Sequence, residues 1–493
     1  MDYLDPKKQS RHSTTLLTGY FLIGLAIIIG TFILVYQAYG FGVSRSGKVM
    51  QSGLVFFSSR PNPANIYFNG QLNKAQTNSR IVLPENIYDV LLTRDGYRDW
   101  KRTIEVSGGS VHHYDYPFLF PKNLVTNKIA AIAGSPNIIT QSPDKRWLLV
   151  QLPEPTLKFN VYDLKNPTDA PTTIAIPENL YTKSGAAENW QLSEWADDNN
   201  HLLITHTFGA QNEYLLISRK NPDQSVNLSS TLTQKFSQLT LINKKYDQYY
   251  LLSQPSGTLS KTTLTAKNPE VVLEKVLQYK SYNTDTLLYV TDTGAPAGKV
   301  QIKLQIKDKA YVLRTTDADS GYLLDLTQYS NDLYVVLGSS SGKKIYVYKD
   351  PVGQINNPEG RSLAPVQVLH VNQPNFVSFS SSAQFVVAEN GSQFAVYDAE
   401  NDKGFNYTAK QPLDQPQVHA SWMDGNRLNY VSQGKLLVFD YDYSNQQFLN
   451  SASSLYLPAF APDYKYVYTV GSSALNSAAF QLNQTALLTK ADL

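Results

Sequence analysis

Two serine-containing segments have the spacing of hydrolase motifs. Gly338–Gly342 (GSSSG) fits Gly-x-Ser-x-Gly, in which a sharp strand-to-helix turn exposes the serine. Here, however, segments with strand character flank it on both sides, at 333–337 and 344–348. Ser142–Lys145 (SPDK) fits Ser-x-x-Lys, but the sequence has neither of its companion motifs, Lys-Thr-Gly and Ser-Asp-Asn. We therefore expect both segments to be loops without a catalytic serine.

Histidine and carboxylate side chains are spaced poorly for a metal ion. His112 and His113 are adjacent on one expected strand, and His201 and His206 are five residues apart on another. An odd separation places two side chains on opposite faces of a strand. Asp317–Gly321 (DADSG) begins like a calcium loop but lacks the later ligands and the glutamate at the twelfth position. We expect no metal site here, nor at the isolated His370 and His419 or at Asp440–Asp442.

The remaining cofactor signals are also weak. Gly294–Lys299 (GAPAGK) is one residue shorter than a phosphate loop and lacks the Ser or Thr after the lysine. Cysteine is absent, which excludes disulfides, thiol nucleophiles and cysteine-based metal sites. A net charge of +2 gives no indication of a nucleic-acid partner. We therefore expect no enzymatic activity and no cofactor, and we assign no catalytic, cofactor-binding or metal-binding residue; ligand-binding residues stay unassigned.

An uncharged apolar run places the chain at a membrane. Leu16–Tyr36 (LLTGYFLIGLAIIIGTFILVY) contains no charge and no proline, and its length matches the roughly 20 residues that a helix needs to cross a bilayer. Tyr20, Tyr36 and Tyr39 lie near its ends, where aromatic rings favour the headgroup level. We predict a transmembrane helix over 14–39; the alternative is a buried core helix of a soluble domain.

The flanks of this run predict its orientation. Three basic residues precede it and two follow it: Lys7, Lys8, Arg11, Arg45 and Lys48. The positive-inside rule thus favours a cytoplasmic tail at 1–13 and an extracytoplasmic bulk. Ala38–Gly40 has the small-x-small pattern of a signal-peptidase site, but the apolar region of a signal peptide spans only about 7–15 residues. We predict an uncleaved signal anchor, followed by a linker over 40–52.

Residues 53–120 read as a small β-sandwich of about five strands. Asn69-Gly70 is a strong hairpin signal because both residues tolerate positive φ. In the segment 100–106 the types alternate with strand period, with Trp100, Ile104 and Val106 expected inward and Lys101, Thr103 and Glu105 outward.

This region resembles a PEGA domain. The resemblance is carried by Ser59–Ala64 (SRPNPA), Ile66–Gly70, Pro84, Tyr88–Val90, Gly96-Tyr97 and Trp100. The sequence departs from the family at Thr77-Asn78, where Thr-Pro is usual, and at Pro84–Asn86, where Pro-Gly is usual. The resemblance implies a β-sandwich appended to envelope or surface proteins, without catalytic residues.

Residues 121–493 contain recurring units of about 40–50 residues, the period of four-stranded propeller blades. In the clearest units an Asp-bearing turn precedes an apolar strand, at Asp144, Asp198, Asp424 and Asp463. Three later strands end in Tyr-Asp or Phe-Asp, at Asp163, Asp398 and Asp440, and weaker units centre near Tyr249, Leu287, Leu333 and Phe385. We expect the turn aspartates to bind their own backbone, and the nearby Trp147, Trp195 and Trp422 to be core residues.

The Ser-Pro-Asp and Trp-x-x-Asp forms resemble TolB-type β-propeller repeats. We therefore predict an all-β ectodomain, a small sandwich plus a seven- or eight-bladed propeller, behind one transmembrane helix. Two consecutive β-sandwiches are the alternative for 121–493. The TolB-related propeller peptidases carry a separate α/β-hydrolase domain after the blades, and we expect none here.

The expected function is binding or scaffolding in the bacterial cell envelope. Propeller loops rich in Tyr, Asn, Gln, Ser and Thr suit protein or sugar recognition. The expected partners are the membrane and an envelope protein or a cell-wall or surface glycan. The alternatives are an extracytoplasmic hydrolase or lyase with a site in the propeller channel, and a ligand sensor that needs a signalling partner.

Overall fold

The computed structural model divides the chain into two compact units. It describes residues 6–38, 41–43, 49–153, 155–184, 188–266, 268–357, 362–415, 418–473 and 476–493. Unit 1 comprises Met1–Asn123 together with Thr489–Asp492, and unit 2 comprises Leu124–Leu488 together with Leu493. Residues 121–123 and 489–492, which we assign to the propeller from sequence, thus belong to unit 1.

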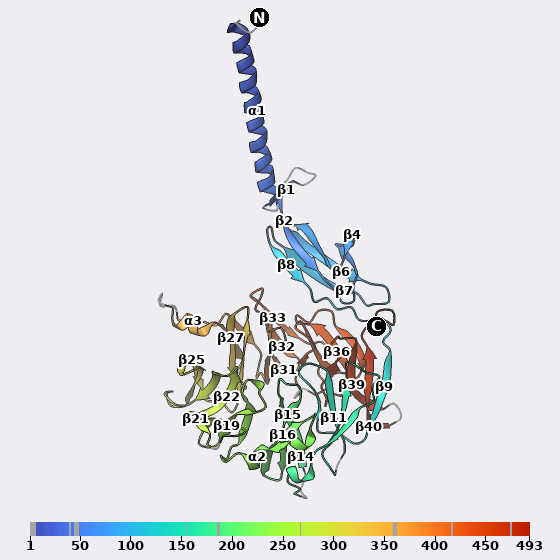
Figure 1. Cartoon of the computed structure of the whole chain (residues 1–493), viewed down its shortest axis with the longest axis vertical. Helices are drawn as coiled ribbons and strands as arrows, with labels where there is room; N and C mark the ends of the chain where they lie inside the picture. Colours follow the sequence, from blue (N-terminus) through green and yellow to red (C-terminus); the bar gives the residue numbers. More distant parts are fainter. Residues whose placement is uncertain are drawn as a thin grey trace. The chain divides into compact units, whose positions relative to one another are not determined.

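Helix α1 (Pro6–Ala38) carries the apolar run (Figure 1). Its portion Arg11–Tyr36 is long and apolar enough to cross a membrane, and none of it is buried. Its large apolar side chains are exposed, as at Leu17 and Phe32, both 72% exposed. By length and composition α1 therefore qualifies as a membrane anchor or a signal sequence. Tyr39, expected at the membrane interface, lies outside the described residues.

The β domain of unit 1 contains two four-stranded sheets. The first has β2 at its centre, with β1, β5 and β8 paired to it, and the second has the order β4-β3-β6-β7. The strands are β1 (Phe41–Val43), β2 (Val49–Phe57), β3 (Asn65–Phe68), β4 (Gln71–Gln76), β5 (Ser79–Pro84), β6 (Asn86–Thr93), β7 (Trp100–Val106) and β8 (Val111–Tyr114). The described strands number eight, against the expected five or so: β1 pairs with the start of β2 within the segment that we predict to be a linker, and β4 and β5 occupy the stretch between the Asn69-Gly70 turn and β6.

The predicted local signals of this domain are confirmed. Asn69 and Gly70 have φ values of 49° and 78° and join β3 to β4 with Phe68 opposite Gln71. In β7, Trp100, Ile104 and Val106 are buried, whereas the intervening Lys101, Thr103 and Glu105 are exposed. These side chains join Val55, Phe57, Ile66 and Leu92 in the core.

Unit 2 is a β-propeller, and its described residues form eight four-stranded antiparallel sheets, numbered here as blades 1 to 8. Blade 1 contains β10 (Ile139–Gln141), β11 (Trp147–Gln151), β12 (Lys158–Asp163) and β13 (Thr172–Ala175). Blade 2 contains β14 (Glu188–Trp195), β15 (His201–Phe208), β16 (Gln211–Ser218) and β17 (Val226–Asn227). Blade 3 contains β18 (Gln238–Leu241), β19 (Gln248–Ser253), β20 (Thr258–Thr263) and β21 (Glu270–Leu273). Blade 4 contains β22 (Val276–Tyr282), β23 (Thr286–Thr291), β24 (Lys299–Ile306) and β25 (Lys309–Asp317).

The second half of the unit repeats this order. Blade 5 contains β26 (Tyr322–Tyr329), β27 (Asp332–Ser339), β28 (Lys344–Lys349) and β29 (Gln367–His370). Blade 6 contains β30 (Phe376–Phe379), β31 (Phe385–Asn390), β32 (Gln393–Asp398) and β33 (Lys403–Thr408). Blade 7 contains β34 (Ser421–Trp422), β35 (Arg427–Ser432), β36 (Lys435–Asp440) and β37 (Gln447–Ser451). Blade 8 contains β38 (Ala459–Phe460), β39 (Tyr466–Ser473), β40 (Asn476–Ala486) and β9 (Thr126–Ile132). Two short helices, α2 (Leu228–Thr231) and α3 (Pro351–Ile355), interrupt the connections.

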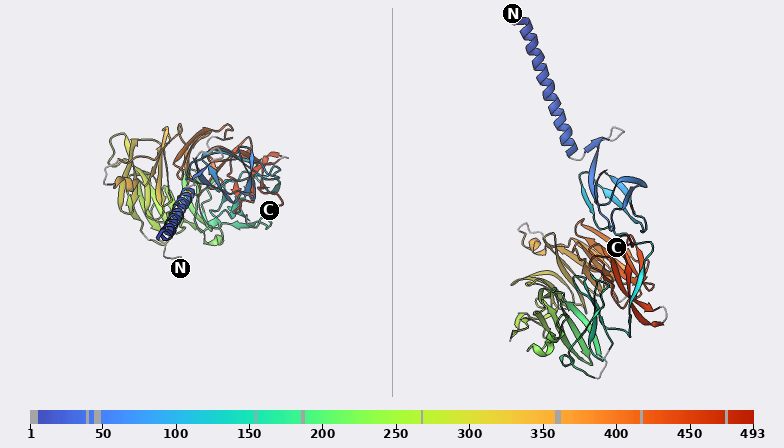
Figure 2. Two further views of the ribbon diagram at one scale, coloured as in Figure 1. Left: turned by 90° about the horizontal axis from the view of Figure 1, so that it is seen from above. Right: turned by 45° about the vertical axis from the view of Figure 1, so that its right-hand side comes forward.

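The first strand of the unit completes its last blade. Strand β9 pairs with β40, with Leu482 opposite Ala130, and the two lie side by side in both views (Figures 1 and 2). The weaker repeat units centred near Tyr249, Leu287, Leu333 and Phe385 are the second strands of blades 3 to 6. The predicted fold class is therefore confirmed, and the sheet order excludes two consecutive sandwiches.

The apolar core of unit 2 lies between neighbouring blades. One cluster combines Leu149 and Phe159 of blade 1 with Trp195 and Ile204 of blade 2. Another combines residues of blade 1 with Leu482 of blade 8. Because each blade buries its faces against its neighbours, the blade order fixes which loops lie together.

Candidate functional site

The repeated aspartates fold their own turns. Asp198 Oδ1 accepts hydrogen bonds from the backbone N–H groups of Asn200 and His201, both at 2.9 Å. The other three do the same: Asp144 accepts from Arg146 at 3.0 Å, Asp424 from Asn426 at 2.8 Å and Arg427 at 2.9 Å, and Asp463 from Lys465 at 3.1 Å. The expected turn bonds are therefore confirmed, and each carboxylate has a structural partner in its own loop.

The three tryptophans do not share one environment. Trp195 is buried, as expected, and its indole N–H donates to Thr140 Oγ1 at 2.9 Å. Trp147 and Trp422 are only half-buried, and Trp147 packs against the edge of the cluster that contains Trp195, so the expectation of a core residue is met in full by Trp195 alone of the three. The reason at Trp147 is that charged groups cover its ring: the guanidinium carbons of Arg146 and Arg219 lie 4.5 and 4.0 Å from the ring centroid.

The two motifs Gly338–Gly342 and Asp317–Gly321 meet at one pocket. The first forms the turn between β27 and β28, so the predicted hairpin loop is confirmed. Ser341 Oγ and its backbone N–H donate to Asp319 Oδ2 at 2.5 and 3.0 Å. These bonds hold the pKa of the Asp319 carboxyl well below its usual range. The Ser340 hydroxyl donates to the Gly321 carbonyl oxygen at 3.2 Å, and no histidine is among the described residues that line this pocket.

The histidines are held by carboxylates and rings. His206 is fully buried; its Nδ1 is 2.8 Å from Glu213 Oε1 and its Nε2 is 3.2 Å from Glu188 Oε2. The ring stacks on Trp190 with centroids 3.7 Å apart. His201, on the opposite face of β15, contacts Asp198 instead. Within the described ranges, no group of three or more His, Asp or Glu side chains is arranged to hold a metal ion.

The first strands of blades 2 to 5 line a common polar pocket in the propeller channel. Its charged groups are paired across blades: Glu194 with Lys244, and Lys280 with Asp325 at 3.3 Å. Glu194 Oε1 also accepts from the Leu241 N–H. Burial of Tyr279, whose hydroxyl is 2.7 Å from Thr240 Oγ1, raises its pKa. Glu194, Lys280 and Tyr279 are thus each engaged by a neighbouring strand or connection.

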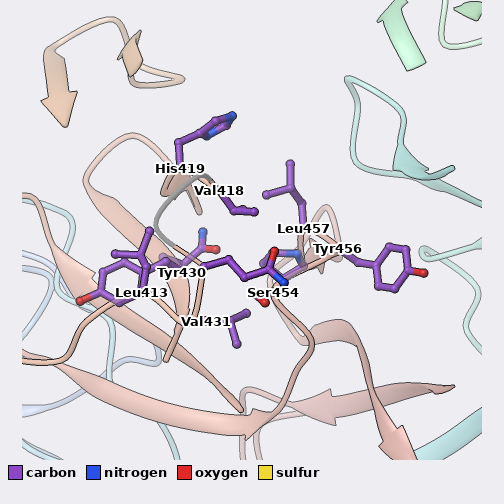
Figure 3. A pocket seen from close by; sticks show the side chains of 11 residues that line it. Leu413, Val418, His419, Tyr430, Val431, Ser454, Tyr456 and Leu457 are labelled. Carbon is purple, nitrogen blue, oxygen red and sulfur yellow. The ribbon is translucent and has the colours of Figure 1, made fainter. Parts of the chain in front are cut away.

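A pocket of different character lies between blades 7 and 8. We call it the 7–8 pocket; its cavity volume is only about 20 Å³, and it is lined by Leu413, Gln415, Val418, His419, Asn429, Tyr430, Val431, Ser454, Tyr456, Leu457 and Pro458. Leu413, Tyr430 and Val431 are buried, but Leu457 is 53% exposed. Figure 3 shows the side chains of Val418 and Leu457 between those of Tyr430 and Tyr456.

The rim of the 7–8 pocket is fixed by aromatic contacts. His419 stacks on Phe376 of blade 6 with centroids 3.6 Å apart. The Tyr430 hydroxyl donates to the Gln411 carbonyl oxygen at 2.6 Å, and the Tyr456 hydroxyl to the Pro136 carbonyl oxygen at 3.1 Å. Leu455, next to the pocket, is 55% exposed. A shallow apolar depression with exposed leucines beside it forms an apolar surface that a partner can cover. Sequence reasoning missed it because it combines the connections before and after blade 7, and no local pattern shows that their side chains meet.

Comparison with known proteins supports the small domain directly. Residues 52–119 match the family described as PEGA domain. No curated protein matches the chain.

Solved structures similar to the chain include a structure of the Dos1 propeller, at 14% identity and a TM-score of 0.46, covering 74% of this chain and 96% of that one. An oligogalacturonate lyase in complex with manganese has 10% identity and a TM-score of 0.39, covering 74% and 98%. An uncharacterized protein from Listeria monocytogenes EGD-e has 11% identity and a TM-score of 0.40, covering 66% and 93%. Because these likenesses are weak, the propeller assignment rests on the sheet order, and the TolB-type resemblance stays a prediction. The chain thus carries a PEGA domain at 52–119 and a β-propeller at 124–488.

Proposed function

We propose that this protein is a membrane-anchored, non-enzymatic binding or scaffold protein of the cell envelope that recognises a partner protein through the 7–8 pocket. Helix α1 serves as an uncleaved anchor, with residues 1–13 in the cytoplasm and the PEGA domain and propeller outside. Three basic residues before the apolar run, against two after it, favour this orientation.

The observation that carries the proposal is the 7–8 pocket with its two exposed leucines. Leu457, which lines the pocket together with buried Leu413 and Val431, is 53% exposed, and Leu455, two residues earlier in the chain, is 55% exposed. Burying a leucine that is otherwise exposed contributes about 1.5–3 kcal/mol, so two such side chains supply the centre of an interface. A glycan needs several converging polar groups, and this lining is mainly aliphatic and aromatic. The partner that suits this surface is a protein whose apolar side chains cover the exposed leucines.

The paired groups elsewhere support a non-enzymatic role. A general acid or base must reach a substrate proton, but Asp144, Asp198, Asp424 and Asp463 bind their own turns. In the channel, where a hydrolase or lyase site would lie, Glu194 and Lys280 are engaged by neighbouring blades.

Site-specific photocrosslinking in intact cells tests the proposal. A photoreactive amino acid replaces Leu455, and the matched control replaces Val271, which is also 55% exposed but lies in blade 3. We expect one discrete, protease-sensitive adduct at position 455 and none at 271. Leu457→Asp should abolish this adduct. Equal labelling at both positions, or an adduct that resists protease and is cleaved by glycan hydrolases, would overturn recognition of a protein.

A further inference from the structure

Strand β2 of the PEGA domain is apolar on both faces. Val55 and Phe57 point into the sandwich and are fully buried. Leu54 and Phe56 alternate with them and therefore lie on the outer face. A strand at the surface of a sandwich normally carries polar side chains outward, whereas a continuous apolar run is typical of a strand that is covered on both faces. The outer face of β2 therefore has the composition of a covered surface.

The neighbouring strands extend this apolar surface. Leu54 is paired with Val82 of β5 on one side and with Val111 of β8 on the other. Val82 is 66% exposed and Val111 is 57% exposed. On the next outward rung, Phe56 lies between Arg80 and His113 and stacks on the imidazole with ring centroids 4.5 Å apart. We call this set of side chains, Leu54, Phe56, Val82 and Val111, the β2 outer face.

We propose that the β2 outer face rests on the surface of the lipid bilayer in which α1 is anchored. The proposal rests on the proposed anchoring by α1. The apolar span ends at Tyr36 and β1 begins at Phe41, a distance of at most about 18 Å along the chain. Strand β1 then pairs with β2 at Gln51, and Leu54 is three residues further along β2, about 10 Å. The tether therefore keeps this face within reach of the membrane.

The size and charge of the face suit a tethered contact with lipid. A few aliphatic side chains bind a bilayer only weakly by themselves. Tethering by α1 makes the contact intramolecular, at an effective concentration on the order of millimolar for a short linker. Arg80, exposed beside Phe56, provides a cation for anionic headgroups.

The absence of cysteine makes single-site labelling a clean test. The full chain is reconstituted into phosphatidylcholine vesicles, with or without phosphatidylglycerol, and carries an environment-sensitive fluorophore at V82C. The matched control is E105C, an exposed position on β7 of the other sheet. L25C, within α1, reports insertion of the helix. Lipids with a nitroxide on the headgroup, or within the acyl chain for L25C, serve as quenchers.

We expect the headgroup nitroxide to quench the fluorescence of the label at V82C and to leave that of the label at E105C nearly unchanged. The loss of fluorescence at V82C should be larger when phosphatidylglycerol is present. Val111→Asp should reduce the quenching at V82C while thermal unfolding shows that the domain stays folded. Quenching of L25C together with equal signals at V82C and E105C would overturn contact with the bilayer and leave the anchor intact. An unquenched L25C would overturn the anchor and this contact together.

Discussion

The Tyr97 hydroxyl donates a hydrogen bond of 2.6 Å to the Asp492 carboxylate, although the two residues are 395 positions apart in the sequence. The Thr489 N–H donates to the same hydroxyl oxygen at 2.8 Å, and Arg94 pairs with Asp492 at 2.5 Å. Tyr97 is almost completely buried. The segment Thr489–Asp492 is therefore a structural part of the unit that contains the PEGA domain.

Removal of the Asp492 carboxylate should loosen this segment. Asp492→Ala deletes the acceptor of the buried Tyr97 hydroxyl, a loss of about 1–3 kcal/mol. We expect the Thr489 amide to exchange its hydrogen faster by roughly tenfold or more, as measured by hydrogen exchange. Asp492→Asn, which keeps an oxygen acceptor, is the matched control and should have a smaller effect. Unchanged exchange in Asp492→Ala would contradict the role of this contact.

Protonation of the Asp492 carboxylate at low pH should loosen the same segment. The Tyr97 hydroxyl, followed by Thr489 and Arg94, lowers the pKa of the Asp492 carboxyl despite the opposing effect of burial. The pKa of this carboxyl is 3.8 in the unfolded chain and lower in the folded chain. The contact therefore stabilises the fold fully above pH 3.8. This stabilisation is lost as the pH falls through the pKa of the folded chain. The protection factor of the Thr489 amide, that is, its exchange rate corrected for the intrinsic rate at each pH, should therefore fall below about pH 4 in the wild-type chain and change much less in Asp492→Ala.

Trp195 and Asp198 allow a comparison between the core and a repeat turn. Trp195→Ala removes a buried side chain from the cluster between blades 1 and 2 and should cost about 3–5 kcal/mol. Asp198→Ala removes two turn hydrogen bonds and should cost on the order of 1 kcal/mol. The half-buried Trp422 should give an intermediate loss on substitution by alanine. Chemical denaturation measures all three, and a larger loss for Asp198→Ala than for Trp195→Ala would contradict this order.

A buried carboxyl makes the stability of unit 2 depend on pH. Glu389 is fully buried; Ala420 N–H donates to its Oε1 at 2.7 Å, and burial raises its pKa to about 8. Between its unfolded value of 4.5 and about 8, the unfolded chain releases this proton while the native chain retains it. Stability should therefore fall as the pH rises through this window, by up to about 1.4 kcal/mol per pH unit.

Glu389→Gln should remove this dependence because its side chain is neutral at every pH. The variant should match the wild type near pH 4.5 and exceed its melting temperature increasingly towards pH 8. Glu270→Gln is the control: its carboxylate is exposed and pairs with Lys261 at 3.2 Å, so it should change stability by less than about 1 kcal/mol. Parallel pH profiles for Glu389→Gln and the wild type would contradict the raised pKa.

The features that sequence predicts here are local ones. The Asn69-Gly70 turn, the alternation from Trp100 to Val106 and the aspartate turns depend on residues a few positions apart. Short-range sterics and hydrogen bonds decide these features, and all of them are confirmed. The period of the repeat also revealed the propeller, including the second strands of its weaker blades.

The features that sequence did not predict depend on distant residues. Nothing near Asp492 indicates that it contacts Tyr97, and nothing near Ser341 indicates that Asp319 accepts its hydroxyl. The 7–8 pocket combines Leu413 and Leu457 from two separate connections. Trp147 begins the second strand of blade 1, and Arg219 of blade 2 covers its ring. Such contacts follow from blade order rather than from local pattern.

Protease accessibility tests the proposed orientation of α1. If the N-terminus is cytoplasmic, protease added outside intact spheroplasts should digest the PEGA domain and the propeller. A tag fused before residue 1 should stay protected until the membrane is permeabilised. A cytoplasmic protein in the same sample controls for lysis. Protection of the propeller would contradict the orientation.

The most direct test of the proposed function compares Asp424→Asn with Leu457→Asp in the propeller, measuring the unfolding midpoint and the yield of the photocrosslinked adduct at position 455. Asp424 Oδ1 and Oδ2 bind the backbone and guanidinium of its own turn, whereas Leu457 is exposed at the 7–8 pocket. We predict that Asp424→Asn lowers the midpoint and keeps the adduct below its melting temperature, and that Leu457→Asp keeps the midpoint and abolishes the adduct. An Asp424→Asn variant of unchanged stability that lost the adduct would place the repeat turns in the binding site and contradict the proposal.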